Sequence, residues 1–285
     1  MILLRSGEMN VRTAEKGGAV ASDVQLDPGA TPLERSRLVL LIHGYCNDLA
    51  DARESYGLFR ANFCLAEPKA QPFATDMFRF YWPGDKSWGW LRFASYPLEI
   101  RPARHSARVL AKFLRTLSKP VELYLIAHSL GNRVAMELLD DFVQSGVPPA
   151  VQLKGICMMA AAVPVSAVRW PGSLHYASLL TRAQVLFSPG DRTLRFAFMP
   201  GQGLSFDSFG SQAVGLHGEP LQQWKWSQPM TYGRKKYDHG DYWRKSETAK
   251  PVADFLNRSV PATIFKRATL SHSLPPANVL VSHTI

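Results

Sequence analysis

The sequence predicts an α/β protein with a mostly parallel central sheet and helices on both faces. Two observations carry this prediction. Short, continuously apolar runs recur along the chain, and segments with helical periodicity stand between several of them. Strands that are apolar on both faces, without polar alternation, are typical of parallel sheets covered by helices. The runs occupy residues 38–45, 78–82, 121–127, 153–163 and 183–188.

The first half of the chain supplies two predicted strands and one helix. Residues 1–36 are mixed and weakly periodic, and we expect a short β pair or a loose arm there. The strands are LVLLIHGY and FRFYW, the second of which stops at a Pro-Gly turn. The helix is expected over 101–118, where apolar residues recur at spacings of three and four, with Pro102 in its first turn.

The second half continues the alternation. Residues 121–131, VELYLIAHSLG, predict a buried strand and a sharp turn, and NRVAMELLDDFV predicts the helix that follows. Further strands are expected at 153–163 and 183–188, with a plausible last strand at Trp224–Trp226 and a final helix over about 246–257. The expected organisation is an arm at 1–36, a main α/β domain at 37–258 and an extension at 259–285.

Composition and charge limit the functional class. With 46% hydrophobic and 20% charged residues in 285, the chain can form a large core and is not intrinsically disordered. Three cysteines without CxxC spacing argue against a disulfide framework or a zinc site. The start lacks the apolar stretch of a secretory signal, so we expect a cytoplasmic protein. The net charge of +10 favours anionic neighbours in general; no nucleic acid is expected, and the oligomeric state stays open.

The strongest motif is Ala127-His128-Ser129-Leu130-Gly131, between a predicted strand and a predicted helix. A nucleophile elbow reads G-x-S-x-G in this context, and here Ala127 replaces the first glycine. The flanking residues are small because the turn is tight. The motif predicts Ser129 as a nucleophile, and the alternative is a serine that caps a helix.

The loop His43-Gly44-Tyr45 follows the first predicted strand of the domain. Acyl transfer needs two N–H donors aimed at the developing oxyanion. We expect these donors to be the backbone amides of Leu130, next to the nucleophile, and Tyr45. His43 is expected to be structural, because it precedes the loop.

The acid and base are expected after the nucleophile, in the chain order Ser, Asp, His. Asp191 follows a strand and a Pro-Gly turn, although an aspartate there could also cap a helix. His239 is preferred as the base because it lies between the last predicted strand and the final helix. His217, in an earlier loop, is the less favoured candidate.

At these residues the chain resembles the α/β-hydrolase superfamily, and in particular bacterial α/β-hydrolase-like serine esterases and lipases of poorly defined substrate. The matching pieces are LIHGYCND, FYWPGD, LIAHSLGNRVAMELL, the strand ending at Asp191, and HGDY. The resemblance implies a Ser-Asp-His triad on an open, mostly parallel sheet, with no metal or organic cofactor. The short segment between Val163 and Arg182 implies a minimal lid.

The predicted function is a serine hydrolase that cleaves small-molecule or lipid carboxylic esters through an acyl-enzyme on Ser129. One alternative is a lipase or phospholipase at an acidic membrane surface, motivated by the charge and by a basic helix face, for which a solvated surface is the simpler interpretation. Another is a non-catalytic interaction protein on a hydrolase scaffold.

A Trp/Phe/Tyr cluster at 82–96 could line an acyl pocket or belong to the core. A Cys46 nucleophile is disfavoured, because no elbow presents its thiol. The basic face consists of Arg101, Arg104, Arg108, Lys112 and Arg115.

Overall fold

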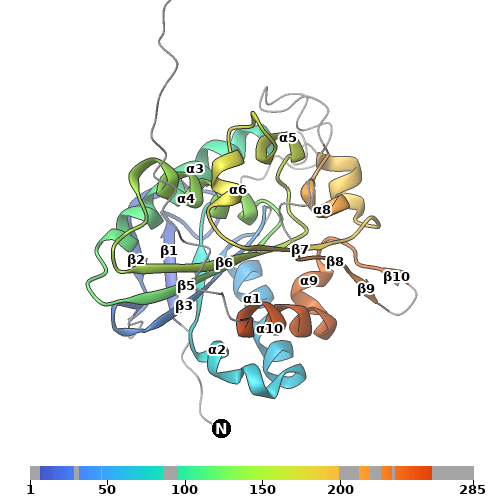
Figure 1. The fold of residues 1–285 in the computed structure, drawn as a ribbon, viewed down its shortest axis with the longest axis horizontal. Coiled ribbons are helices and arrows are strands. Elements are labelled where there is room, and N and C mark those ends of the chain that lie inside the picture. Colours follow the sequence, from blue (N-terminus) through green and yellow to red (C-terminus); the bar gives the residue numbers. More distant parts are fainter. Residues whose placement is uncertain are drawn as a thin grey trace, which may run out of the picture.

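The computed structural model describes residues 7–28, 32–45, 47–85, 96–198, 212–218, 226–232 and 235–258. A single eight-stranded sheet runs through the molecule, and helices cover both of its faces (Figure 1). The predicted α/β class is therefore confirmed. The sheet strands are β1 (Glu8–Arg12), β2 (Val20–Leu26), β3 (Arg37–Ile42), β4 (Met77–Tyr81), β5 (Val121–His128), β6 (Val151–Met159), β7 (Ala183–Phe187) and β8 (Trp226–Pro229).

The strand order is β2-β1-β4-β3-β5-β6-β7-β8. Only the β1–β2 pair is antiparallel, and every other neighbouring pair is parallel. The carboxyl ends of β3, β5, β6 and β7 therefore meet at one edge of the sheet, where ligands bind in open α/β folds. A separate two-stranded hairpin is formed by β9 (Thr231–Tyr232) and β10 (Lys235–Lys236).

The helices form a layer on each side of the sheet. In Figure 1, α3, α4 and α6 lie on one face, and α1, α9 and α10 lie on the other. The helices are α1 (Leu49–Ala66), α2 (Gln71–Thr75), α3 (Tyr96–Arg115), α4 (Gly131–Ser145), α5 (Val165–Val168), α6 (His175–Leu179), α8 (Val214–His217), α9 (Asp241–Arg244) and α10 (Ala249–Asn257). Shorter helical turns are η1 (Pro32–Glu34), η2 (Pro68–Ala70), η4 (Leu194–Phe198) and η5 (Ser246–Thr248).

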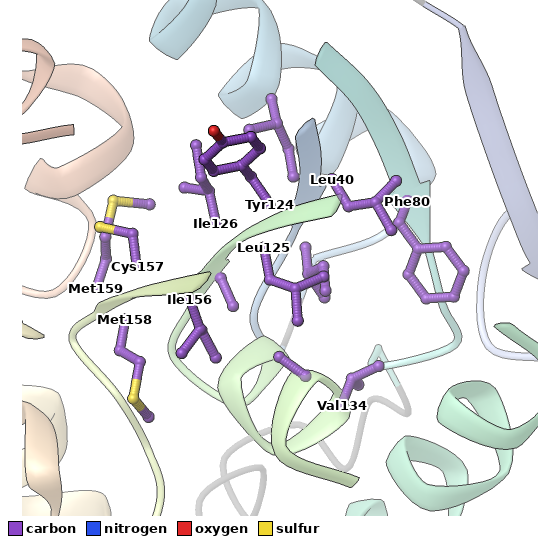
Figure 2. Close-up of a cluster of buried hydrophobic side chains, with 14 of the residues drawn as sticks. Leu40, Phe80, Tyr124, Leu125, Ile126, Val134, Ile156, Cys157, Met158 and Met159 are labelled. Atoms are coloured by element: carbon purple, nitrogen blue, oxygen red, sulfur yellow. The ribbon is translucent and has the colours of Figure 1, made fainter. Parts of the chain in front are cut away.

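The central strands are apolar throughout because both of their faces are buried. Successive residues of a strand point to opposite faces. Leu125 of β5 and Ile156 of β6 point toward α4, whereas Tyr124 and Ile126 point to the other layer (Figure 2). Leu125, Ile126 and Ile156 are at most 1% exposed. This two-sided burial explains why the sequence shows continuous apolar runs.

The predicted N-terminal β pair is part of the main sheet. β2 pairs with β1, and β1 lies parallel to β4. The buried Arg12 side chain donates to the Trp82 carbonyl (3.0 Å) and to the Asp85 carboxylate (2.7 Å), which fastens β1 to the chain after β4. Residues 8–26 thus extend the sheet of the domain. The expected extension at 259–285 lies outside the described residues.

Three local features differ from the sequence predictions. Helix α1 was not predicted, although its buried residues 49, 52, 56, 59 and 63 follow helical spacing and Asp48 forms a capping box at its start. Helix α3 begins at Tyr96 instead of residue 101, so Pro102 lies inside the helix and not in its first turn. Strand β6 ends at Met159 and not at residue 163 as predicted, because Ala160 has a left-handed backbone with φ 45°.

Candidate active site

Ser129 stands in the sharp turn between β5 and α4. Its backbone has φ 52°, in the left-handed region that non-glycine residues seldom adopt. Hydrogen bonds hold the turn on both sides: the Ser129 N–H donates to the Met159 carbonyl (2.9 Å), and the Ser129 carbonyl accepts from the Ala162 N–H (3.1 Å). Such strained residues persist when their surroundings fix them, and they cluster at functional sites.

Two glycines allow the close packing around this turn. A Cβ atom on Gly131 would lie 2.3 Å from the His43 carbonyl oxygen and 2.5 Å from that of Ile42. A Cβ on Gly44 would lie 2.6 Å from the Ser129 Cβ. The start of α4 therefore packs directly on the end of β3, and the loop after β3 packs on Ser129. Ala127 is buried in β5, where its methyl group is accommodated.

The structure brings Ser129, His239 and Asp191 together, although they are far apart in sequence. His239 Nε2 lies 2.7 Å from Ser129 Oγ, and His239 Nδ1 lies 2.7 Å from Asp191 Oδ2. Asp191 is fully buried, whereas the His239 side chain is 19% exposed. With the proton on Nδ1 donated to Asp191, Nε2 is free to accept the hydroxyl proton of Ser129.

Asp191 makes the contacts expected for both of the alternatives that the sequence left open. Its Oδ1 accepts from the Leu194 N–H (2.9 Å) and so caps the helical turn that begins after it. Its Oδ2 is left for His239. The cap fixes the carboxylate, and the second oxygen orients the imidazole.

Hydrogen bonds fix the loop between β10 and α9, which carries His239, both to the end of β7 and within the loop itself. The Ser188 hydroxyl, at the end of β7, donates to the Tyr237 carbonyl (2.7 Å). The Asp238 N–H donates to the Asp241 carboxylate, and the His239 N–H donates to the Asp238 carboxylate. The flanking aspartates thus hold the main chain of the loop, while Asp191 holds the ring.

His217, the alternative base, is exposed at the end of α8. Neither Ser129 nor Asp191 is among the hydrogen-bond partners of its side chain in the described part of the chain. Cys46 lies outside the described residues.

The family described as "Alpha/beta hydrolase of unknown function (DUF900)" matches residues 30–204, well over half of the chain. The chain belongs to this α/β-hydrolase family. The parallel sheet and the elbow after β5 agree with that membership, and the predicted fold is confirmed.

Solved structures similar to this α/β-hydrolase share little of its sequence. A protein of Lactobacillus plantarum WCFS1, provisionally described as a cell surface hydrolase, is 10% identical with a TM-score of 0.45, over 81% of this chain and 95% of that chain. The product of the lin2722 gene from Listeria innocua is 9% identical with a TM-score of 0.44, over 80% and 96%. Est1E from Butyrivibrio proteoclasticus, bound to ferulic acid, is 12% identical with a TM-score of 0.41, over 80% and 91%. No curated protein matches significantly.

The two expected oxyanion donors belong to two different segments that meet at Ser129. Leu130 is fully buried and is the N-cap residue of α4. Among the described residues, no carbonyl accepts a hydrogen bond from its N–H. Tyr45 belongs to the loop after β3, whose Gly44 packs on Ser129, and it is half-buried.

The buried His43 holds this loop through hydrogen bonds. Its backbone N–H donates to the Tyr56 hydroxyl (2.6 Å). In the ring, Nδ1 donates to the Gly44 carbonyl (2.8 Å), and Nε2 accepts from the backbone N–H of Trp82 (3.3 Å). Burial lowers the pKa of His43 to about 3, so the ring is neutral. The expected structural role of His43 agrees with these contacts. Trp82 is buried beside it, whereas residues 88–93 of the aromatic cluster lie outside the described residues.

Sequence reasoning missed one residue of the site. His128, which precedes the nucleophile, is 4% exposed, and its Nε2 lies 2.7 Å from the His239 carbonyl oxygen. A polar histidine at the end of an otherwise apolar strand was the available signal.

The segment 163–182, expected to be too short for a large lid, contains only the short helices α5 and α6.

None of the helices in the described ranges is both long and apolar enough to cross a bilayer. The cytoplasmic location stays a prediction.

Proposed function

We propose that this α/β-hydrolase is a serine hydrolase that cleaves carboxylic esters through an acyl-enzyme on Ser129. The observation that carries the proposal is the position of the His239 ring. One nitrogen is 2.7 Å from the Ser129 hydroxyl oxygen and the other is 2.7 Å from a buried Asp191 oxygen. This is the geometry of a nucleophile, a general base and an orienting acid.

In the proposed mechanism, Ser129 Oγ attacks the ester carbonyl while His239 Nε2 takes the hydroxyl proton. Asp191 stabilises the imidazolium that forms. The protonated His239 then donates its proton to the departing alcohol, which leaves the acyl group on Ser129. Water, activated by the same imidazole, attacks the acyl-enzyme and releases the acid.

The negative charge on the tetrahedral intermediate needs fixed donors. The Leu130 and Tyr45 backbone amides are the proposed pair. Leu130 lies at the amino end of α4, where the helix dipole favours negative charge. Removing one such donor typically lowers kcat by about 100- to 1,000-fold.

A panel of soluble esters of increasing acyl length, assayed with wild-type protein and Ser129→Ala, tests the proposal. We expect Ser129→Ala to lower turnover about 1,000-fold or more while the circular dichroism spectrum stays unchanged. A fluorophosphonate probe should label the wild type at Ser129 and should not label the variant. Absence of both turnover and labelling in the folded wild type would favour the non-catalytic scaffold instead.

A second candidate is a lipase or phospholipase that works at an acidic membrane surface. The basic face of α3 does not favour it strongly, because three of its cations form ion pairs. Arg104 pairs with Glu137, Lys112 with Asp23, and Arg115 with Asp141. Such pairing leaves little positive charge for lipid headgroups.

A different surface, beside the triad, favours this candidate. We call it the Asp191-side patch: Arg192, Arg195, Phe196, Lys235 and Lys236. All five side chains are exposed, Phe196 by 70%. Among the described residues, none of the four cations forms an ion pair.

Two contacts place this patch at the turn before Asp191. Arg195 donates to the Pro189 carbonyl (2.9 Å), and a Cβ on Gly190 would lie 2.6 Å from the Lys236 Cβ. Exposed cations together with an exposed aromatic side chain suit an anionic bilayer surface.

Flotation with vesicles of phosphatidylcholine, with and without phosphatidylglycerol, tests the surface. We expect binding only to anionic vesicles, falling with salt. The double variant Arg192→Gln/Arg195→Gln should lose it, and the matched α3 double variant Arg101→Gln/Arg108→Gln should retain it. Equal loss in both would indicate non-specific attraction, and no binding by the wild type would remove this candidate.

A further inference from the structure

His128 makes a direct contact with the loop of the proposed base. Its Nε2 lies 2.7 Å from the main-chain carbonyl oxygen of His239. Because a carbonyl only accepts, Nε2 must carry the proton and donate it. This hydrogen bond joins the last residue of β5 to the loop between β10 and α9, 111 positions away.

The surroundings of the other ring nitrogen fix the same tautomer. His128 Nδ1 is buried and has no hydrogen-bond partner among the described residues. It faces Gly44, where a Cβ would lie 3.2 Å from it. A proton on Nδ1 would be a buried donor without an acceptor, which is costly. Burial accordingly lowers the pKa of His128, to about 3, with the nearby His239 as a lesser cause.

Aromatic rings hold the His128 ring in place. Its centroid lies 4.9 Å from that of His239, 5.6 Å from that of Trp243 and 5.9 Å from that of Tyr242. Trp243 and Tyr242 belong to α9, directly after the His239 loop. The end of β5 and the loop with α9 therefore form one packed unit.

We propose that His128 is a positioning residue for His239, and that it sets the distance between the base and the nucleophile. The nucleophile Ser129 is the next residue in the chain, so the element that presents Ser129 also holds the main chain of its base. Asp191 fixes the His239 ring at Nδ1, and His128 fixes the peptide that carries the ring. This inference rests on the proposed function only in treating His239 as the base.

Three variants separate the hydrogen bond from mere packing. His128→Gln keeps an N–H group near the position of Nε2 and so can still reach the His239 carbonyl. His128→Asn has the same amide on a side chain one methylene shorter, which falls short of that carbonyl. His128→Phe keeps a ring but has no donor. The Gln and Asn variants are the matched pair, and they still decide the matter if the Phe variant does not fold.

We expect the Asn and Phe variants to lower kcat for a small soluble ester about tenfold, with KM changed less than about twofold. A tenfold loss corresponds to about 1.4 kcal/mol in the barrier, the size of one lost hydrogen bond. His128→Gln should restore kcat to within about threefold of the wild type. Equal kcat in the Asn and Gln variants, or a loss confined to KM, would overturn the positioning role.

A second readout needs no substrate. Proton NMR of ¹⁵N-histidine-labelled protein should show a low-field signal for the His239 Nδ1–H donated to Asp191, because that bond is short. The signal should move or broaden in His128→Asn and return in His128→Gln. An identical signal in all variants would refute the inference. If the wild type turns over no ester, the proposed function fails, and this spectrum alone decides the role of His128.

Discussion

Replacing Gly131 by alanine should disturb the fold and the site together. Gly131 is the first residue of α4, two positions after Ser129. An added Cβ would lie 2.3 Å from the His43 carbonyl oxygen and 2.5 Å from the Ile42 carbonyl oxygen. Ordinary carbon–oxygen contacts lie at about 3.3–3.6 Å, so α4 and β3 must separate by about 1 Å.

The cost follows from what has to move. Both obstructing oxygens belong to the backbone at the end of β3, so no side chain can rotate away. Overpacking of this kind costs about 1–3 kcal/mol or more, and we expect the upper end here. The lower entropy of the unfolded alanine chain offsets at most about 1 kcal/mol. The net loss in the free energy of unfolding should be about 2 kcal/mol or more.

Gly57 offers a matched control. It lies inside α1, and a Cβ there would meet nothing within 4 Å. Gly57→Ala should therefore raise stability by about 0.5–1 kcal/mol through helix propensity alone.

Urea unfolding followed by circular dichroism measures both variants, and the two midpoints should shift in opposite directions. In the same preparations, Gly131→Ala should lower ester turnover by about 100-fold, since a 1 Å displacement near reacting groups has that effect. A Gly131→Ala midpoint equal to that of the wild type would refute the steric reasoning. Normal turnover with lowered stability would refute only the link to Ser129.

The remaining predictions concern histidines and one buried hydroxyl. His239→Ala should abolish ester turnover and His217→Ala should leave it near the wild-type rate; the reverse result would reject the assignment of the base. His43 and His128 have folded pKa values of about 3, below the unfolded value of about 6.5. Their contribution to stability is full above pH 6.5 and is lost as the pH falls toward 3, by about 1.4 kcal/mol per pH unit for each histidine. When the free energy of unfolding in urea is measured across this acid range, its slope against pH should be lower in His128→Gln than in the wild type by about 1.4 kcal/mol per pH unit. An unchanged slope would contradict the linkage. Tyr56→Phe should lower the free energy of unfolding, measured by thermal unfolding, by about 1–3 kcal/mol, because the backbone N–H of His43 loses its buried acceptor. An unchanged free energy of unfolding would show that this N–H finds another partner.

Local patterns in the sequence were sufficient for much of the sheet and for the residues of the proposed triad. The strand at 121–128 was predicted because apolar continuity is a property of neighbouring residues. Ser129 stood out because the elbow needs small residues at fixed positions around it. Asp191 and His239 followed from chain order, and in the structure one nitrogen of His239 contacts the Ser129 hydroxyl while the other contacts Asp191.

Other features could not be derived from local patterns. Helix α1 was overlooked, although its buried residues follow helical spacing. Only the structure shows what they pack against, such as the contacts of the Tyr56 hydroxyl with the His43 N–H and the Phe80 carbonyl. The contact of His128 with the His239 carbonyl also joins distant parts of the chain.

By itself, the sequence determined the fold class, the elbow at Ser129 and the order in which acid and base follow, since each depends on residue types at short spacing. Tertiary structure alone decided that Asp191 contacts both a helical turn and His239, that three basic residues of α3 are paired, and that His128 bonds the His239 carbonyl. These properties depend on distances between segments up to 111 positions apart. Such distances arise only when the strands align in the sheet and bring their carboxyl ends to one edge.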